Sequence, residues 1–352
     1  MISTLTHLHI IYEHGEDLKP FSIAYIRDIL PFTHTLNASV FQVTDSTSYS
    51  PADIIVAERG WKPGLNVQQA EQLVHQVHQD NASLIYTIDD NLLDLEYVSL
   101  PVRQAVIYFC RHADAILTST EYLKNRLQHL NPHIFVLPNS LDEKLFTDNS
   151  QRLPVRRNTS SHLTIGFMGT YTHDADLMMV LQALRTVLRQ HMDTVQLQIV
   201  GGVSDPGLIR LFQGLPVQVL HPDLNDVAYP NFIQWMKKNL AWDIGLAPLE
   251  DTPFNLCKSD IKFLDYSALG IPGIYSQVPS YESTIRHMEN GYLVENTPAA
   301  WTEALELLLA DIELRIRLAQ NAQEYVFSQR TLQQCAHLWR EAVLSIPKTG
   351  AV

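Results

Sequence analysis

Short apolar runs rich in β-branched residues alternate along the chain with longer segments in which apolar residues recur at helical spacing. This alternation is typical of β-α-β units, in which helices connect parallel strands. In the first half, the runs that predict strands are residues 7–12, 38–43, 53–57, 84–88, 115–118 and 134–137. The pattern then repeats, with runs at 164–168, 197–200, 217–220, 243–247 and 273–275. Helical spacing is clearest in residues 67–79, 102–111 and 177–190.

The repeated alternation predicts an α/β protein of two Rossmann-like, doubly wound domains. A polar segment, DNSQRLPVRRNTSSH at residues 148–162, separates the two series and has the composition of a linker. We therefore place the domains at residues 1–150 and 160–327, and a length of 352 residues agrees with about 150 residues per domain. Open α/β sheets bind ligands beyond the carboxyl ends of their strands, so the site is expected in an interdomain cleft.

Composition narrows the class of protein. Lys and Arg number 25 against 38 Asp and Glu, a formal charge of −13, which disfavours a general nucleic-acid binder but leaves room for a smaller phosphate ligand. The three cysteines include no CxxC pair, and neither a secretory leader nor a membrane-spanning stretch is apparent, so we expect a cytoplasmic protein with reduced thiols. Arg152, Arg156 and Arg157 either contact an anionic membrane surface or belong to a solvated linker.

The loop FMGTYTHDAD, residues 167–176, follows one predicted strand and precedes a predicted helix. A glycine there lets backbone amides approach a ligand, and the helix start adds free N–H groups, so Gly169, Thr170 and His173 form a candidate phosphate site. Gly201, after the next strand, offers a second close approach. The alternative is that these residues only turn the chain and that a nearby Asp caps the helix. No GxGxxG fingerprint is present.

A second candidate is the segment PFNLCKSDIKFLDYSALGIP, residues 253–272. If it is a helix, Lys258, Lys262 and Asp265 share one face. Two ammonium groups beside a carboxylate suit a sugar nucleotide, because the lysines neutralise a diphosphate while the carboxylate accepts hydrogen bonds from ribose. Ser259 is included in this donor site. The alternative is an ordinary surface ion pair.

A third candidate is the pair Asp89 and Asp90, at the carboxyl end of an apolar strand of the first half. Carboxylates at that position can accept a proton or orient a hydroxyl, and both are candidate catalytic residues. Asp90 serves equally well as a cap for the following turn. His75 and His78 have the spacing of two metal ligands, but no third ligand is near in the sequence, so no metal site is predicted.

Several segments resemble those of retaining family-4 glycosyltransferases, in the same order. They are ADAILTSTEYLKNRL (113–127), IFVLPNSLDEKLF (134–146), IGFMGTYTHDADL (165–177), WDIGLAPL (242–249) and LDYSALGIPGIYS (264–276). The last two are similar to the family's "ADIFVLPS" and "LEAMACGxPVVAS" motifs, and the second to "VIPNGVDxxxF". The resemblance covers nearly the whole chain.

The resemblance implies a GT-B fold, with the donor on the second domain, the acceptor on the first, and a C-terminal helix at about 328–352 packing back on the first domain. Asp265 stands where the family has the second glutamate of its E-x7-E motif, which holds the ribose. Cys257 stands where the first glutamate contacts the sugar, and Asp89 where many members have a histidine. The family's Arg and Lys diphosphate pair is absent, so Lys258 and Lys262 are expected to supply that charge.

The expected function is transfer of a hexose from a nucleoside-diphosphate sugar to a glycan, lipid-linked or protein-bound acceptor with retention of configuration. Two alternatives stay open: a sugar-nucleotide epimerase of the same fold, and a non-catalytic partner subunit. No metal cofactor is expected, because lysines provide positive charge and no DxD-type pair follows a strand of the donor half. A peripheral location at the inner face of the membrane is compatible with the cytoplasmic assignment.

Overall fold

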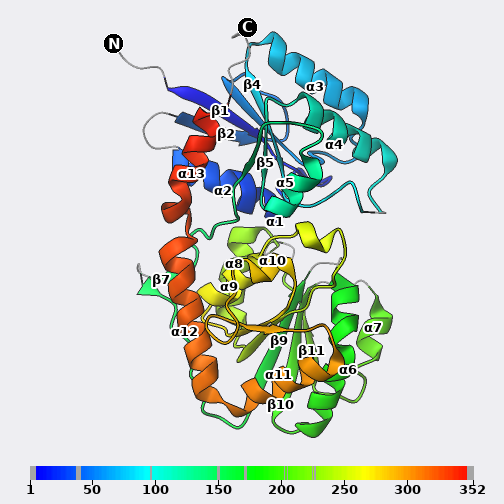
Figure 1. The fold of residues 1–352 in the computed structure, drawn as a ribbon, viewed down its shortest axis with the longest axis vertical. Helices are drawn as coiled ribbons and strands as arrows, with labels where there is room; N and C mark the ends of the chain where they lie inside the picture. Colours follow the sequence, from blue (N-terminus) through cyan, green and yellow to red (C-terminus); the bar gives the residue numbers. More distant parts are fainter. Residues whose placement is uncertain are drawn as a thin grey trace.

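The computed structural model describes residues 5–36, 41–95, 97–148, 151–169, 173–201, 203, 205–223, 225 and 227–346. The chain forms two domains, each built on a parallel six-stranded sheet flanked by helices, and one domain lies above the other in Figure 1. The predicted fold class, two Rossmann-like α/β domains, is confirmed.

The first sheet has the strand order β2-β1-β3-β4-β5-β6, and every neighbouring pair is parallel. Its strands are β1 (Thr6–Ile11), β2 (Phe41–Ser46), β3 (Ile54–Glu58), β4 (Ser83–Ile88), β5 (Ala115–Thr118) and β6 (Ile134–Val136). The connecting helices are α1 (Ser22–Ala24), the π-helix η1 (Tyr25–Ile29), α2 (Leu30–Leu36), α3 (Val67–Gln79), α4 (Leu100–His112) and α5 (Glu121–Leu127). Every residue of β4 is buried, as expected for a strand covered on both faces.

The second sheet has the order β11-β10-β9-β12-β13-β14 and is also parallel throughout. Its strands are β9 (Leu163–Gly169), β10 (Val195–Gly201), β11 (Val217–Leu220), β12 (Ile244–Ala247), β13 (Gly273–Ser276) and β14 (Tyr292–Val294). Its helices are α6 (Asp174–Gln190), α7 (Pro206–Arg210), α8 (Tyr229–Asn239), the 3-10 turn η4 (Asn255–Cys257), α9 (Ile261–Ala268), α10 (Pro279–Glu282) and α11 (Pro298–Ala310). Two short antiparallel strands, β7 (Thr147–Asp148) and β8 (Gln151–Arg152), lie between the sheets in sequence.

In the first sheet the second strand, β2, lies at one edge, and the chain then crosses to β3 on the other side of β1. In the second sheet β10 and β11 extend to one edge, and the chain then crosses to β12 on the other side of β9. The order therefore reverses between β1 and β3 in one sheet and between β9 and β12 in the other. Ligands of open α/β sheets bind at such switch points. Gly169, the last residue of β9, lies at the switch point of the second sheet.

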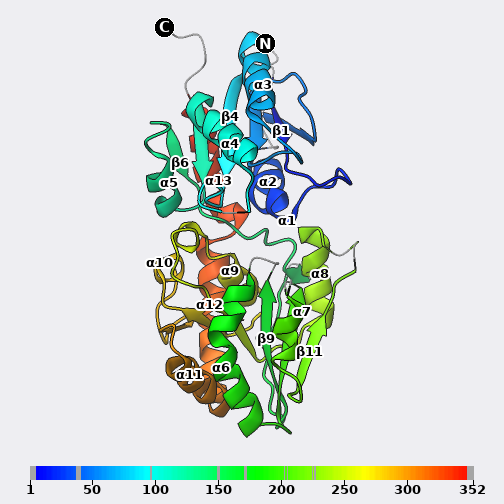
Figure 2. The same ribbon diagram turned by 90° about the vertical axis from the view of Figure 1, so that its right-hand side faces the viewer.

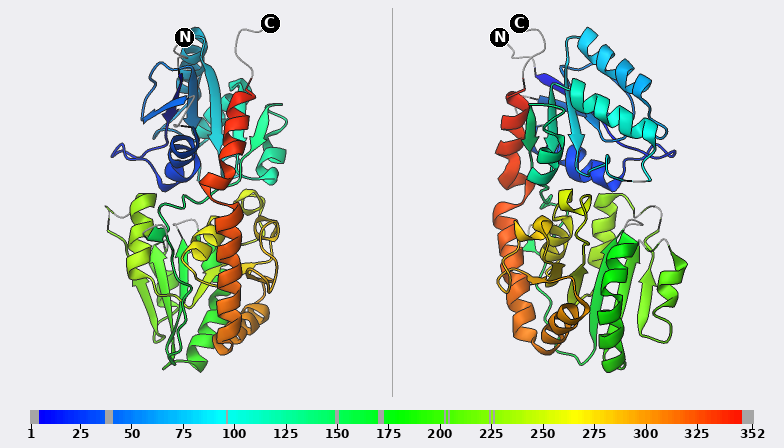
Figure 3. Two further views of the ribbon diagram at one scale, coloured as in Figure 1. Left: turned by 90° about the vertical axis from the view of Figure 1, so that its left-hand side faces the viewer. Right: turned by 45° about the vertical axis from the view of Figure 1, so that its right-hand side comes forward.

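The last two helices connect the domains. α12 (Ile312–Gln329) packs along α9 of the second domain, and α13 (Leu332–Leu344) packs on α2 of the first. Trp339 meets Phe32 edge to face, with ring centroids 5.2 Å apart. Figure 3 (left) shows α12 and α13 as one column beside both domains. Within the described residues, no helix combines the length and the apolar character needed to cross a membrane.

Candidate active site

The residues just before α9 contact the first domain through two hydrogen bonds. The Thr120 hydroxyl, at the start of α5, donates to the carbonyl of Cys257 over 2.9 Å. The Asn139 amide donates to the Ser259 hydroxyl over 2.7 Å. In Figure 2 the loops of the second domain that precede α9 meet the lower end of the first domain. The predicted donor residue Ser259 therefore lies at the junction, with its hydroxyl already accepting one hydrogen bond.

Cys257 packs into the first domain. It is 4% exposed and belongs to the apolar core that covers one face of the first sheet. Burial raises the pKa of its thiol to about 11. In glycosyltransferases that this chain resembles, the equivalent position holds a sugar-binding glutamate, but here the side chain faces away from the donor half. The neighbouring Phe254 packs against the same core.

Lys258 lies outside the helix on which it was expected. The chain forms the turn η4 and α9 begins only at Ile261, so Lys262 and Asp265 are helical and Lys258 is not. The conditional prediction of one helical face for all three residues was therefore wrong for Lys258, because Asp260 occupies the cap position and ends the extended segment. Burial lowers the pKa of Lys262 to about 7, and the positive charge of Lys258 is the second cause of this shift. The two lysines therefore still influence each other.

Lys262 of α9 lies against His173, the residue that precedes α6. Its ammonium is 3.2 Å from Nε2 of His173, whose Nδ1 is 2.6 Å from Asp176 Oδ2. Burial, and then the charge of Lys262, lower the pKa of His173 to about 4. The ring is therefore neutral near pH 7, with Nδ1 donating to Asp176, and the Lys262 ammonium lies against the ring, 3.4 Å from Nδ1 as well as 3.2 Å from Nε2. Asp176 Oδ1 also accepts the backbone N–H of Glu250 over 2.7 Å.

Asp265, one turn after Lys262 on α9, is 3% exposed. Its Oδ1 accepts a hydrogen bond of 2.7 Å from the hydroxyl of Tyr229, the first residue of α8. Burial raises the pKa of Asp265 to about 7, while Tyr229 and Lys262 act in the opposite direction. The sequence analysis missed Tyr229, which has no local signal because it lies 36 residues away in the chain.

Two glycines end neighbouring strands at the same place. Gly169 of β9 pairs with Gly201 of β10, and Gly201 has φ of +68°. A Cβ atom on Gly201 would lie 2.8 Å from the carbonyl oxygen of Gly169, and one on Gly169 would lie 2.9 Å from the Cβ of His173. This close packing leaves room only for glycine. The predicted phosphate ligand Thr170 lies outside the described residues.

On the first domain, Asp89 and Asp90 follow β4. Asp89 is 6% exposed, and its Oδ1 is 3.5 Å from Nη1 of Arg59. Burial, and then the charge of Asp90, raise the pKa of Asp89 to about 6. Ser119 donates to the backbone carbonyl of Asp89 over 3.2 Å, and Thr120 beside it holds the Cys257 segment. The pair thus lies beside the interdomain contact.

Further buried charges surround Asp89. Asp28 is fully buried, accepts a hydrogen bond of 2.9 Å from Thr87, and has a pKa raised by burial to about 7. Glu58 ends β3, and burial raises the pKa of its carboxyl well above the usual range. Sequence reasoning missed both. Glu58 is the last residue of β3, close to the position that Asp89 and Asp90 have after β4, and this is a signal which could have found Glu58. Asp28 lies in η1 and has no such signal.

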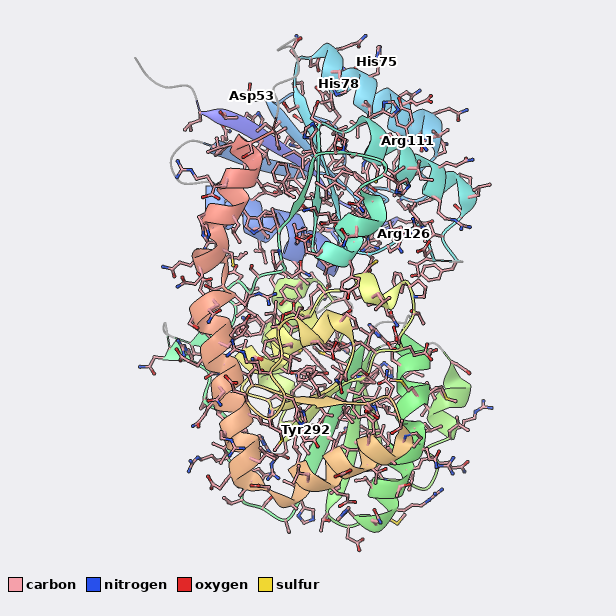
Figure 4. All side chains as sticks on the ribbon, in the orientation of Figure 1. Asp53, His75, His78, Arg111, Arg126 and Tyr292 are labelled. Carbon is pink, nitrogen blue, oxygen red and sulfur yellow. The ribbon has the colours of Figure 1, made fainter. Side chains whose placement is uncertain are left out.

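Possible metal ligands lie elsewhere. Within the described part of the chain, His34, Asp142 and Glu143 form a group close enough to hold an ion. They lie where α2 meets the turn before β7, and not around α9. His75 and His78 lie on α3, at the end of the first domain remote from the second (Figure 4). His78 is 3.6 Å from Asp114. None of these residues belongs to the candidate site around Lys258 and Lys262.

Comparison with known proteins agrees with the fold. Residues 162–311 match the family model for group 1 glycosyl transferases. A D-inositol 3-phosphate glycosyltransferase of Corynebacterium urealyticum is 24% identical over 236 residues, which is 62% of this chain and 53% of that protein. The match thus spans about half of that relative's length.

Solved structures match over almost the whole chain. The structure of Anabaena Alr3699/HepE in complex with UDP-glucose has a TM-score of 0.67 at 13% identity, covering 97% of this chain and 100% of that one. Sucrose-phosphate synthase from Thermosynechococcus elongatus also has a TM-score of 0.67, at 16% identity and the same coverage. Residues 162–311 therefore match the group 1 glycosyl transferases in sequence, within a chain that has the fold of GT-B glycosyltransferases.

Proposed function

We propose that the protein is a retaining glycosyltransferase that transfers a hexose from a nucleoside-diphosphate sugar to a glycan, lipid-linked or protein-bound acceptor. The observation that carries this proposal is the position of Lys262. Its ammonium lies against His173 at the start of α6, 3.2 Å from Nε2, and the positive charge of Lys258 contributes to lowering its pKa. A like-charged neighbour and burial make this a costly site for a cation, and a bound diphosphate would relieve that cost.

The donor would extend from the lysines toward Asp265. The α- and β-phosphates face Lys258, Lys262 and the close-packed strand ends at Gly169 and Gly201. Asp265, held by Tyr229, accepts the ribose hydroxyls. UDP-glucose bound to the similarly folded Anabaena protein supports a uridine nucleotide as the first donor to test.

In the proposed reaction no protein nucleophile is needed. The bond between the sugar's anomeric carbon and the leaving phosphate oxygen breaks, and a bond to the acceptor oxygen forms on the same face. The acceptor proton passes to the leaving phosphate oxygen, whose growing charge the two lysines stabilise. Asp89 and Asp90, across the domain junction, would orient the acceptor hydroxyl. Because the ammonium groups supply this stabilisation, we propose that turnover does not require a metal ion.

A panel of UDP-, GDP- and dTDP-sugars, with product detection by mass and anomeric configuration by NMR, tests this function. Lys258→Ala is expected to lower kcat by about 100-fold, the usual effect of removing one group that stabilises transition-state charge. Lys144→Ala is the matched control, because Lys144 lies on the turn before β7 and belongs to neither η4 nor α9. If Lys258→Ala keeps kcat within about twofold at saturating donor, the proposed phosphate role is wrong.

Cys257 favours a second candidate, a partner subunit that keeps the fold without turnover. Its side chain fills the first domain's core, so the sugar-contacting carboxylate of the resembling family has no equivalent at this position. Thermal unfolding with each nucleotide separates the candidates. A ligand at 100 times its Kd adds about 2.7 kcal/mol of stability, so an unchanged Tm with UDP, GDP and dTDP would favour the partner subunit.

A further inference from the structure

A groove with a volume of about 330 Å³ lies between α4 and α5, on the outer surface of the first domain. Its charged lining consists of Arg103 and Arg111 from α4, Arg126 from α5, and His129 just after α5. No acidic residue lines it, and the thirteen residues of α4 contain none. This α4/α5 groove is therefore locally cationic on a chain whose formal charge is −13.

One of the three arginines has a carboxylate partner. Arg126 is paired in a fork with Asp94, with Nη2 to Oδ1 at 2.8 Å and Nε to Oδ2 at 3.1 Å. The Nε of Arg103 is buried and has no hydrogen-bond partner among the described residues. The three guanidinium groups that line the groove thus include one that is paired with Asp94, and an anion bound in the groove would meet the other two. In Figure 4, Arg111 and Arg126 lie on the same side of the first domain, with Arg126 nearer the second domain.

The same groove has an apolar wall. Leu93, Ile107 and Leu130 line it together with Leu100. On α4, residues 100, 103, 107 and 111 follow each other at spacings of three and four, so leucine, isoleucine and arginine share one helical face. Leu100 is 61% exposed, and Tyr97 in the preceding turn is 60% exposed. Leu100 therefore presents a large apolar side chain to water beside the arginines.

We propose that the α4/α5 groove docks the protein on a membrane surface by binding the phosphate headgroups of anionic lipids. Arginine guanidinium groups bind phosphate oxygens in pairs, and exposed leucine side chains enter the boundary between headgroups and acyl chains. A small phosphate compound would satisfy the arginines and leave Leu100 in water, so the mixed lining favours a lipid.

The α4/α5 groove is a better membrane contact than Arg152 and Arg156 of the linker. Arg152 pairs with Glu324, and Arg156 pairs with Asp243 at 3.0 Å, so both already have carboxylate partners within the protein. The groove belongs to the first domain, the proposed acceptor side, and α5 separates it from the Cys257 segment. Docking is a property of the α4/α5 surface and does not depend on the proposed activity.

Co-sedimentation of the full chain with vesicles tests the proposal. Mixed phosphatidylglycerol and phosphatidylcholine vesicles are compared with pure phosphatidylcholine, at low and high salt. The variant Arg103→Gln/Arg111→Gln removes two charges from the groove, and Leu100→Ser removes apolar contact. The matched control is Arg189→Gln/Arg317→Gln, two exposed arginines on α6 and α12 of the second domain. Circular dichroism establishes that each variant is folded.

We expect binding to the anionic vesicles only, weakened by salt and reduced about 30-fold in Arg103→Gln/Arg111→Gln, with the control pair within about twofold of the wild-type chain. Leu100→Ser should also weaken binding. Equal binding to both vesicle types, no binding, or unchanged binding by the folded groove variant would overturn the proposal. So would full displacement from vesicles by glycerol 3-phosphate at constant ionic strength, which would identify a soluble phosphate compound as the occupant.

Discussion

The ammonium of Lys262 lies 3.2 Å from Nε2 of His173, and the opposite ring nitrogen lies 2.6 Å from Asp176. The carboxylate fixes a neutral imidazole, and the ammonium lies against this ring, since it is also 3.4 Å from Nδ1. His173 is thereby a positioning residue, because it touches the lysine proposed to bind phosphate. Its position at the start of α6 also joins the β9 loop to α9.

His173 variants test this arrangement. His173→Phe keeps an aromatic ring but offers Lys262 no acceptor, so we expect the KM for the donor to rise about tenfold while kcat falls less. His173→Gln can still accept from Lys262 and is expected to restore part of the loss. Titration calorimetry with UDP and steady-state kinetics measure the two effects. Equal behaviour of Phe and Gln would show that the ring only fills space.

Donor affinity should be greatest near pH 7. Lys262 has a pKa lowered to about 7, so it loses its charge as pH rises, and UDP binding should weaken up to about tenfold per pH unit above that value. Asp265 has a pKa raised to about 7, so it becomes protonated as pH falls, and ribose contacts weaken below that value. The two groups are close, so the apparent pKa values of the acid limb and the alkaline limb of the affinity profile describe the pair and not either residue alone.

Calorimetric UDP titrations from pH 5.5 to pH 9 follow both limbs. Lys262→Arg keeps its charge throughout and should flatten the alkaline limb. Tyr229→Phe removes a hydrogen bond that favours the ionised carboxylate, so the acid limb should move to higher pH. A pH-independent Kd for the wild-type chain would contradict both assignments.

Gly201 and Gly214 form a matched pair. Both have positive φ, +68° and +80°, but a Cβ on Gly201 would lie 2.8 Å from the Gly169 carbonyl while one on Gly214 meets nothing within 4 Å. Gly214→Ala is expected to cost about 1 kcal/mol for its backbone alone. Gly201→Ala should cost about 1 to 3 kcal/mol more, since the close approach adds strain, and should weaken UDP binding. Chemical denaturation measures both; equal costs would exclude the steric contribution.

Arg330 joins the two domains. It forms a two-pronged ion pair with Asp260, at 2.8 and 2.9 Å, and donates to the carbonyl of Asn139 over 2.8 Å. Arg330→Gln leaves Asp260 buried without its partner, so we expect a loss of about 3 to 5 kcal/mol in the free energy of unfolding. Arg330→Lys keeps the charge but not the fork, and its loss should be intermediate. If Arg330→Lys is as damaging as Arg330→Gln, the charge contributes nothing.

The sequence alone predicted much of the architecture. Helix α3 occupies residues 67–79 as expected, and the strands lie close to the predicted runs. For the run predicted at residues 38–43, β2 covers Phe41–Ser46, and residues 38–40 lie outside the described residues. These elements are legible because burial on both faces of a parallel sheet demands continuous apolar runs, and helices demand their own spacing. Such requirements act on neighbouring residues, so the pattern appears locally.

The sequence by itself determined the residue types of the candidate site: a glycine at the end of β9, lysines and an aspartate around α9, and carboxylates after β4. Only the tertiary structure decided their partners. It placed Tyr229 on Asp265 and His173 on Lys262, turned Cys257 into the first domain, and set Lys258 before the helix. Each of these contacts joins segments far apart in the chain, so it depends on how helices and domains pack rather than on any local periodicity.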